Sequence, residues 1–232
     1  MDQLRTSAAR NNAEWCDLVA RSHGAVTQFA DDAWTSATRT PPYYPDAVTL
    51  VPTPSVPDLL SRIDTSAGCS IKDSFAALDL APHGFRVLLD AEWITRASPS
   101  VAGADPVPGW TRVLDRDGLS AWEAAWRGDD GPTGLFRADL LDRESVAVLA
   151  LYAADLLVAG AVLNRSSTVV GVSNVFAAPG SDADAWAGCV AYAASIFPEV
   201  PIVGYESGDA LVAAGDHGFA TAGPLRVWIL DG

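Results

Sequence analysis

Two side chains that could do chemistry, Glu206 and Ser207, directly follow an apolar segment near the end of the chain. That segment, Ile202–Tyr205, has the composition of a short strand, and Gly208 comes after the pair. Ligands tend to bind at the carboxyl ends of strands in open α/β sheets. A partly buried Glu206 could act as a general base, and Ser207 could donate a hydrogen bond. The alternative is an exposed carboxylate at a strand end with no chemical role.

The histidines and the remaining acidic residues predict no second catalytic or metal centre. His23, His83 and His217 each precede a glycine, a pattern that indicates a helix C-terminus, where histidine complements the helix dipole. No Ser-His-Asp or Cys-His arrangement, phosphate-binding loop or dinucleotide motif follows from the spacing. Asp182 and Asp184 could be metal ligands, but they have no third partner nearby, so we predict no metal site.

Charge and cysteine content exclude several classes of function. The 232 residues carry a formal net charge of −14, which repels nucleic acid and acidic membranes, and Lys72 is the only lysine. Cys16, Cys69 and Cys189 have no metal-site spacing and are typical of buried thiols in a reducing compartment. We find no signal peptide or membrane-spanning run. We therefore expect a cytoplasmic monomer or homodimer without a nucleic-acid or membrane partner.

A short motif occurs twice in the chain. His83–Ile94 and His217–Ile229 each begin with His-Gly-Phe, contain Trp-Ile and follow an alanine-rich stretch. Glycine tolerates the left-handed conformation that ends a helix, so each copy predicts a helix stop followed by a strand that its phenylalanine anchors. Two copies indicate a repeated α/β element, with coincidence as the other interpretation.

Hydrophobic periodicity predicts an α+β chain. We expect strands at 47–51, 70–75, 85–94, 110–114, 146–152, 156–163, 169–176 and 202–205, and a strand or a hairpin at 219–230. We expect helices at 11–23, 29–36, 56–63, 119–127, 184–197 and 209–216, the fourth capped by Asp117. Residues 97–109 are rich in Ala, Ser, Pro and Gly, which favours a linker.

From Trp110 to Leu230, a three-strand meander that leads into a helix resembles the GNAT fold of CoA-dependent N-acetyltransferases. The likeness is strongest over Pro201–Ile229, and residues 47–94 look like a shortened copy of the same ending. The resemblance implies an α+β fold with a GNAT-like mixed sheet flanked by helices. It divides the chain into a degenerate N-terminal GNAT-like half (1–96), a linker (97–109) and a C-terminal GNAT-like domain (110–232).

The resemblance also implies a place for acetyl-CoA. In the family, the pantetheine arm of CoA pairs with the third meander strand, which splays away from its neighbour; the matching residues are Asn174, Val175 and Phe176. The pyrophosphate lies on the next loop and the start of the following helix, which here corresponds to Gly180 and Ser181.

The sequence departs from the family pattern at two points. The loop at 177–186 has one glycine, no arginine or glutamine, and two aspartates that repel a pyrophosphate. The alternative is that Ser181 or Asp182 caps the following helix and no ligand binds there. The family's tyrosine, which protonates the leaving thiolate, is replaced by Ala214, and an asparagine that often ends the preceding strand is replaced by Ser207.

The sequence leaves two functions open. The first is an acyl-CoA-dependent N-acyltransferase that acts on a small amine, with Glu206 as the base. The second is a catalytically silent GNAT-like protein that binds a small ligand or a protein partner in the same place.

Overall fold

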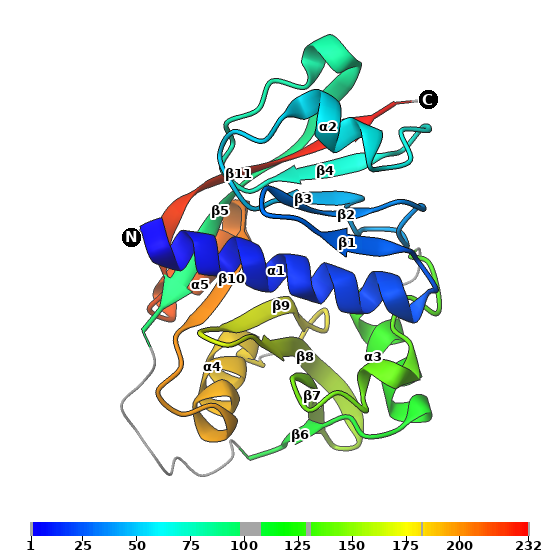
Figure 1. Cartoon of the computed structure of the whole chain (residues 1–232). Coiled ribbons are helices and arrows are strands. Elements are labelled where there is room, and N and C mark those ends of the chain that lie inside the picture. The colour runs from blue at the N-terminus through cyan, green and yellow to red at the C-terminus, as the bar shows by residue number, and fades with distance from the viewer. Residues whose placement is uncertain (1, 98–107, 129–130, 182, 232) are drawn as a thin grey trace. The chain divides into compact units, whose positions relative to one another are not determined.

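The computed structural model describes residues 2–97, 108–128, 131–181 and 183–231, and the chain divides into two compact units (Figure 1). The first unit comprises Met1–Ile94, Tyr205–Leu211 and Thr221–Gly232. The second comprises Thr95–Gly204 and Val212–Ala220. Each unit has helices packed on a mixed sheet, so the predicted α+β class and helix-flanked mixed sheet are confirmed.

The sheet of the first unit follows the order β1-β2-β3-β4-β11-β5. Its strands are β1 (Thr27–Phe29), β2 (Ala33–Ser36), β3 (Ala47–Thr49), β4 (Ser70–Asp73), β5 (Phe85–Arg96) and β11 (Ala220–Leu230). The β3–β4 pair is parallel, whereas β1–β2, β2–β3 and β4–β11 are antiparallel. The last strand of the chain, β11, thus lies between β4 and β5, two strands of the N-terminal half.

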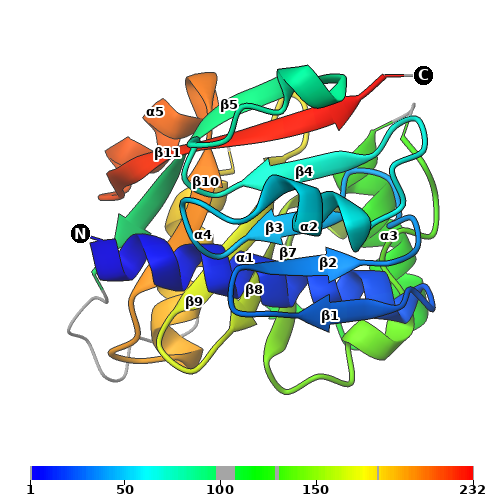
Figure 2. The same cartoon turned by 45° about the horizontal axis from the view of Figure 1, so that its top comes forward.

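Two helices cover opposite faces of this sheet, as the view in Figure 2 shows. The long helix α1 (Asp2–Ser22) packs on one face, where it shares a core cluster with Trp34. The short helix α2 (Val56–Ser61) places Leu59 against Ala33, the residue before that tryptophan. Successive side chains of a strand point to opposite faces, so neighbouring residues of β2 serve two different cores.

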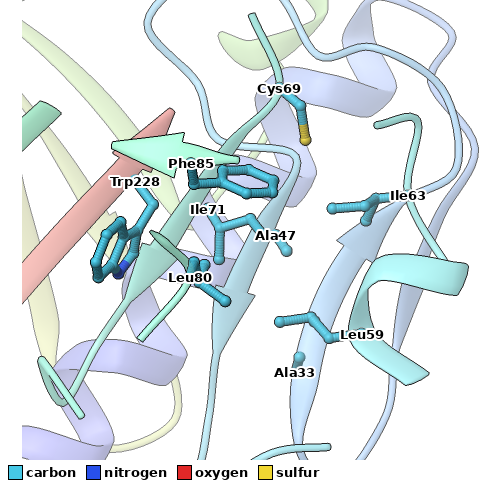
Figure 3. Packing of buried hydrophobic residues seen from close by; sticks show 9 residues of the cluster. All are labelled: Ala33, Ala47, Leu59, Ile63, Cys69, Ile71, Leu80, Phe85 and Trp228. Atoms are coloured by element: carbon cyan, nitrogen blue, oxygen red, sulfur yellow. The ribbon is translucent and has the colours of Figure 1, made fainter. Parts of the chain in front are cut away.

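The core beneath α2 depends on segments that are far apart in the sequence. Figure 3 shows Leu59 and Ile63 facing a cluster that includes Ile71, Phe85 and Trp228. Phe85 and Trp228 come from β5 and β11, and each is 4% exposed. Burying each aromatic side chain contributes about 1.5–3 kcal/mol, so the C-terminal strand is an integral part of the first unit.

The predicted helix at 29–36 is wrong. Those residues belong to the β1–β2 hairpin, in which Phe29 pairs with Trp34 and the Ala30 amide donates to the Ala33 carbonyl. Asp31 and Asp32 are turn residues here, although aspartate is also a common helix cap. The first helix, α1, begins at Asp2 and not at the predicted residue 11.

The sheet of the second unit follows the order β10-β9-β8-β7-β6. Its strands are β6 (Trp110–Arg112), β7 (Val146–Ala153), β8 (Leu156–Arg165), β9 (Val170–Ala177) and β10 (Ile202–Glu206). The predicted meander is confirmed as the antiparallel run β7-β8-β9, and β9 pairs in parallel with β10. The last two residues of β10 belong to the first unit.

Two helices, α3 (Arg116–Arg127) and α4 (Ala185–Ile196), pack on β8 and β9. The cap of α3 is Asp115, which accepts a hydrogen bond from the Gly118 amide, and not the predicted Asp117. The third helix, α5 (Gly208–Asp216), begins in the first unit and ends in the second. Short 3₁₀ turns lie at Ala81–His83 and Ala138–Leu140.

Both glycines of the repeated motif have the predicted left-handed conformation. The φ angle is +86° at Gly84 and +81° at Gly218, and the strands β5 and β11 follow them and are neighbours in the sheet. The first copy ends a 3₁₀ turn and the second ends α5. A common origin of the two copies stays a prediction.

Residues 98–107 of the predicted linker lie outside the described residues, and the three-part division at 1–96, 97–109 and 110–232 stays a prediction. No helix in the described chain combines the length and the apolar character needed to cross a membrane. The same residues hold no group of three or more His, Cys, Asp or Glu side chains placed to bind a metal ion.

Candidate functional site

Glu206 and Ser207 lie together in a hollow of about 420 Å³ that belongs wholly to the first unit. β10 ends at Glu206 and α5 begins at Gly208, so the pair occupies a strand-to-helix turn, as the sequence predicted. The other walls of the hollow come from β5 and β11. We call this feature the Glu206 hollow.

Burial raises the pKa of the Glu206 carboxyl to about 7. Loss of solvation disfavours the charged form of a carboxyl group, and nothing compensates for it here. Within the described chain, no cation forms an ion pair with Glu206 and no donor is bonded to its oxygens. A carboxyl group with a pKa near neutrality suits a general base, because it can take up a proton and release it again.

The other charges in the Glu206 hollow favour a cationic ligand. Arg226 donates through Nε to Asp90 Oδ1 at 2.7 Å, so this guanidinium is already neutralised. Glu92 adds a further carboxyl group to the lining. The summed charge of the lining is therefore negative, which attracts an ammonium group.

The pairing of β9 with β8 contains a bulge, and the pairing of β9 with β10 ends part-way along the strand. Gly160 pairs with Phe176 and Val162 with Ser173, so two residues of β9, Asn174 and Val175, oppose a single residue of β8. Asn174 has a φ angle of +53°, a conformation that asparagine tolerates better than most residues. The bulge redirects the backbone of β9 at the residues that the resemblance assigned to the pantetheine arm.

The pairing of β9 with β10 covers only the start of both strands. Val170 pairs with Ile202 and Gly171 with Val203, and the described chain shows no further pair between these strands. Past Gly171, this edge of β9 can therefore pair with an extended ligand. The Ser173 hydroxyl, next to the bulge, is buried without a hydrogen-bond partner in the described structure.

The start of α4 is occupied by the protein's own carboxylate. Asp184 Oδ1 accepts a hydrogen bond from the Ala187 amide at 2.9 Å, and Asp184 Oδ2 lies 2.8 Å from His217 Nε2. The hydrogen bond from Ala187 is the main cause that lowers the pKa of Asp184, and His217 lowers it further. The Ala213 carbonyl is the main cause that raises the pKa of His217, and Asp184 adds to it.

The loop before α4 uses its amide groups internally. The Ser181 amide donates to the Ala178 carbonyl, and the Ala183 amide donates to Ser181 Oγ at 3.1 Å. Asp182 lies outside the described residues. A pyrophosphate needs free amide groups at a helix start, and here the Asp184 carboxylate holds that place. The described residues that follow β9 therefore do not fit a pyrophosphate.

The predicted site residues fall into two groups. Glu206 and Ser207 belong to the first unit; Asn174, Val175, Phe176, Gly180 and Ser181 belong to the second. The Phe176 ring packs edge-on against Trp122, with the ring centres 5.4 Å apart, so the Phe176 side chain is part of a core. Only the backbone of Phe176 is left for a ligand to reach.

Lys72 is a buried cation that was not among the predicted site residues. This side chain lies on β4, is 4% exposed and lines a separate cavity in the first unit. Its signal in the sequence was that the chain's one lysine falls within a predicted strand, where a charged residue is unexpected.

The fold of this chain is similar to that of solved structures, although its sequence matches no known family. No family model matches the sequence, and no curated protein is similar to it. The structure is similar to a GCN5-related N-acetyltransferase from Kribbella flavida, with a TM-score of 0.64 and 14% identity over 97% of this chain and 96% of that chain. The chain has the GNAT fold.

Two other solved structures are also similar to this chain. A protein from Novosphingobium aromaticivorans assigned to the GNAT acetyltransferases has a TM-score of 0.62 and 13% identity over 94% of this chain and 96% of that chain. An N-myristoyltransferase from Saccharomyces cerevisiae, solved with myristoyl-CoA and inhibitors, has a TM-score of 0.52 and 9% identity over 76% of this chain and 55% of that chain. At these identities the likeness concerns the GNAT fold alone.

Proposed function

We propose that the protein is an N-acyltransferase that moves an acyl group from a thioester donor, acetyl-CoA or a close relative, to a small amine. The observation that carries this proposal is Glu206, a carboxyl group at the end of β10 whose pKa burial raises to about 7. The GNAT fold and the open edge of β9 support it.

The reaction needs a group that takes a proton from the amine. The amine nitrogen attacks the thioester carbonyl, the C–N bond forms, the C–S bond breaks, and the sulfur leaves as a thiolate. In our proposal, Glu206 accepts the proton that the ammonium form of the acceptor loses before attack, directly or through a water molecule. The second proton, released when the C–N bond forms, passes to the leaving thiolate, which becomes a thiol. Glu92 attracts the ammonium form of the acceptor to the Glu206 hollow, and Ser207 donates a hydrogen bond.

The proposed donor is recognised mainly through its pantetheine arm. The arm carries amide groups that can pair with the backbone of β9 beyond Gly171, at the Asn174 bulge. The start of α4 adds little, because Asp184 and His217 occupy it. A thioester that lacks the pyrophosphate should therefore bind about as well as acetyl-CoA.

Calorimetric titration with acetyl-CoA and acetyl-pantetheine tests this proposal. We expect saturable binding of both, with dissociation constants within about threefold of each other. The Asp184→Asn variant keeps a capping side chain but removes the charge, so it should tighten acetyl-CoA binding and leave acetyl-pantetheine unchanged. The matched control is Asp209→Asn, in the first turn of α5, which should change neither. Absence of binding by both thioesters at millimolar concentration would contradict the proposal.

The Asp184 carboxylate at the start of α4 also favours a second function. The Asp184–His217 pair and the alanine at position 214 remove two features that the family uses for CoA and for protonation of the thiolate. A catalytically silent GNAT-like protein that binds a small ligand or a protein partner would keep the fold without them. It would show no acyl transfer to any amine, even where a thioester binds.

A further inference from the structure

A cavity of about 670 Å³ lies within the first unit, apart from the Glu206 hollow. Its walls come from β4, β5 and β11, from the segment 39–46 and from Tyr205. The volume falls in the range of about 300–1,000 Å³ that is typical of small-molecule sites. We call it the Lys72 cavity.

Lys72 brings a buried positive charge to this cavity. Its side chain is 4% exposed, its Nζ donates to Asn12 Oδ1 at 2.8 Å, and the same nitrogen lies 4.0 Å from the centre of the Tyr205 ring. The described residues provide no carboxylate within ion-pair distance of it. An ammonium group has three donors, and burying a charge without a counter-ion is costly, so the site is incomplete without an acceptor.

The one carboxylate in the lining does not serve Lys72. Asp46 is 2% exposed and takes a 2.7 Å ion pair from Arg39. It also accepts hydrogen bonds from the Thr40 and Ser70 amides, each at 3.0 Å. Arg39 and Asp46 thus neutralise each other, and the ammonium of Lys72 sets the net charge of the cavity.

The rest of the lining favours an apolar ligand body. Val227 pairs with Lys72 and Ile229 with Ser70 across the β4–β11 ladder, so all four point to the same face of the sheet. Leu88 and Leu89 add further aliphatic surface. Apolar groups of a ligand would gain stability by leaving water at these side chains.

We propose that the Lys72 cavity binds a small monocarboxylic acid with an apolar body, whose carboxylate accepts hydrogen bonds from Lys72 Nζ. A carboxylate supplies the missing counter-ion, and charge-assisted hydrogen bonds of this kind are stronger than neutral ones. A second charge on the ligand would lack a partner, because Arg39 is already engaged. The site is independent of Glu206 and of any thioester donor.

Three probes of equal chain length separate charge from apolar contact: octanoate, octanamide and octylamine. Calorimetric titration of the full chain should show octanoate binding at least about tenfold more tightly than octanamide, with no binding of octylamine. The Lys72→Met variant has a similar shape without charge and should lose at least about tenfold in octanoate affinity. Arg86→Gln, which removes an exposed cation of β5 paired with Asp231, is the matched control and should bind octanoate normally.

A second variant keeps the test valid if Lys72→Met fails to fold. Leu88 is 51% exposed and lines the cavity, so Leu88→Trp should fill the space without disturbing the core. We expect it to abolish octanoate binding while the thermal midpoint stays unchanged. The proposal is overturned if octanoate does not bind at millimolar concentration, if octylamine binds equally well, or if a folded Lys72→Met variant keeps full affinity.

Discussion

Glu206 owes its proton affinity to burial. Its sequence position predicted a carboxyl group at a strand end, and the structure confirms that placement. The raised pKa could not be predicted, because the walls that exclude water from Glu206 come from β5 and β11, strands that local sequence does not connect to β10. For the same reason the burial of Lys72 was not predictable: it depends on Asn12, sixty positions away.

Removing the Glu206 carboxyl should slow acyl transfer. In the wild type, kcat/KM for an amine acceptor should rise with pH through about 7, as Glu206 loses its proton. The Glu206→Gln variant should lose about 10²- to 10⁴-fold in kcat/KM and lack this pH step, because glutamine takes up no proton. Glu92→Gln, another acid of the same hollow, is the control and should keep the pH step. A variant of Glu206 with full activity would remove this residue from the mechanism.

The same carboxyl group should make stability depend on pH. The folded chain holds the Glu206 proton up to about pH 7, whereas a free glutamate releases it near the ordinary value of 4.5. The folded state binds more protons in this window, so the free energy of unfolding falls as pH rises from 4.5 to 7. After allowance for partial exposure, Glu206→Gln should gain up to about 2 kcal/mol at pH 8 and little at pH 4. Urea titrations at both pH values measure this difference; an equal gain at each would contradict the assignment.

At the scale of elements, apolar periodicity predicted the strands and the meander well, because each strand keeps one pattern along its length. The errors concern aspartate, which is common both in turns and at helix caps. Asp31 and Asp32 turn a hairpin and do not cap a helix, and Asp115 caps α3 in place of Asp117. Only the family resemblance predicted that β9 splays away from its neighbour. Local sequence does not report this feature, because it depends on how β9 and β10 diverge beyond Gly171.

Close packing between α4 and β6 gives a prediction at this scale. A methyl group on Gly188 of α4 would overlap with the indole ring of Trp110, so helix and strand would have to move apart. Gly188→Ala should lower the free energy of unfolding by about 1–3 kcal/mol, as overpacking usually does. Gly215→Ala in α5 is the matched control: its methyl group meets nothing within 4 Å, and it should raise stability by about 0.5–1 kcal/mol. Chemical denaturation of both variants checks the contrast, and equal effects would contradict it.

At the scale of the whole molecule, the first unit is assembled from three separate stretches of chain. The division at 1–96, 97–109 and 110–232 stays a prediction, because composition and linker-like segments report only on order along the chain. The central place of β11, between β4 and β5, is a matter of long-range pairing that no local signal reports. The Phe85–Trp228 core of Figure 3 is its direct consequence.

A shortened chain tests how far the first unit depends on this strand. A variant that stops before Thr221 loses Trp228 and leaves β4 and β5 without the strand between them. Hydrogen exchange should show the amides of β4 and β5 unprotected, while β7 and β8, paired with each other, keep their protection. Removal of only Asp231 and the last residue is the control and should leave β4 protected. Protection of β4 in the shorter chain would show that the N-terminal strands fold without β11.

The late position of β11 also governs how the protein can fold on the ribosome. Translation delivers β4 and β5 long before the strand that belongs between them, since more than a hundred residues separate β5 from β11. Throughout that interval the edges of β4 and β5 that later pair with β11 lack this partner, and the apolar surface that Trp228 covers in the folded chain is left uncovered. Such edges are the usual starting point of aggregation, so holding chaperones should bind this segment until synthesis of the last strand is complete.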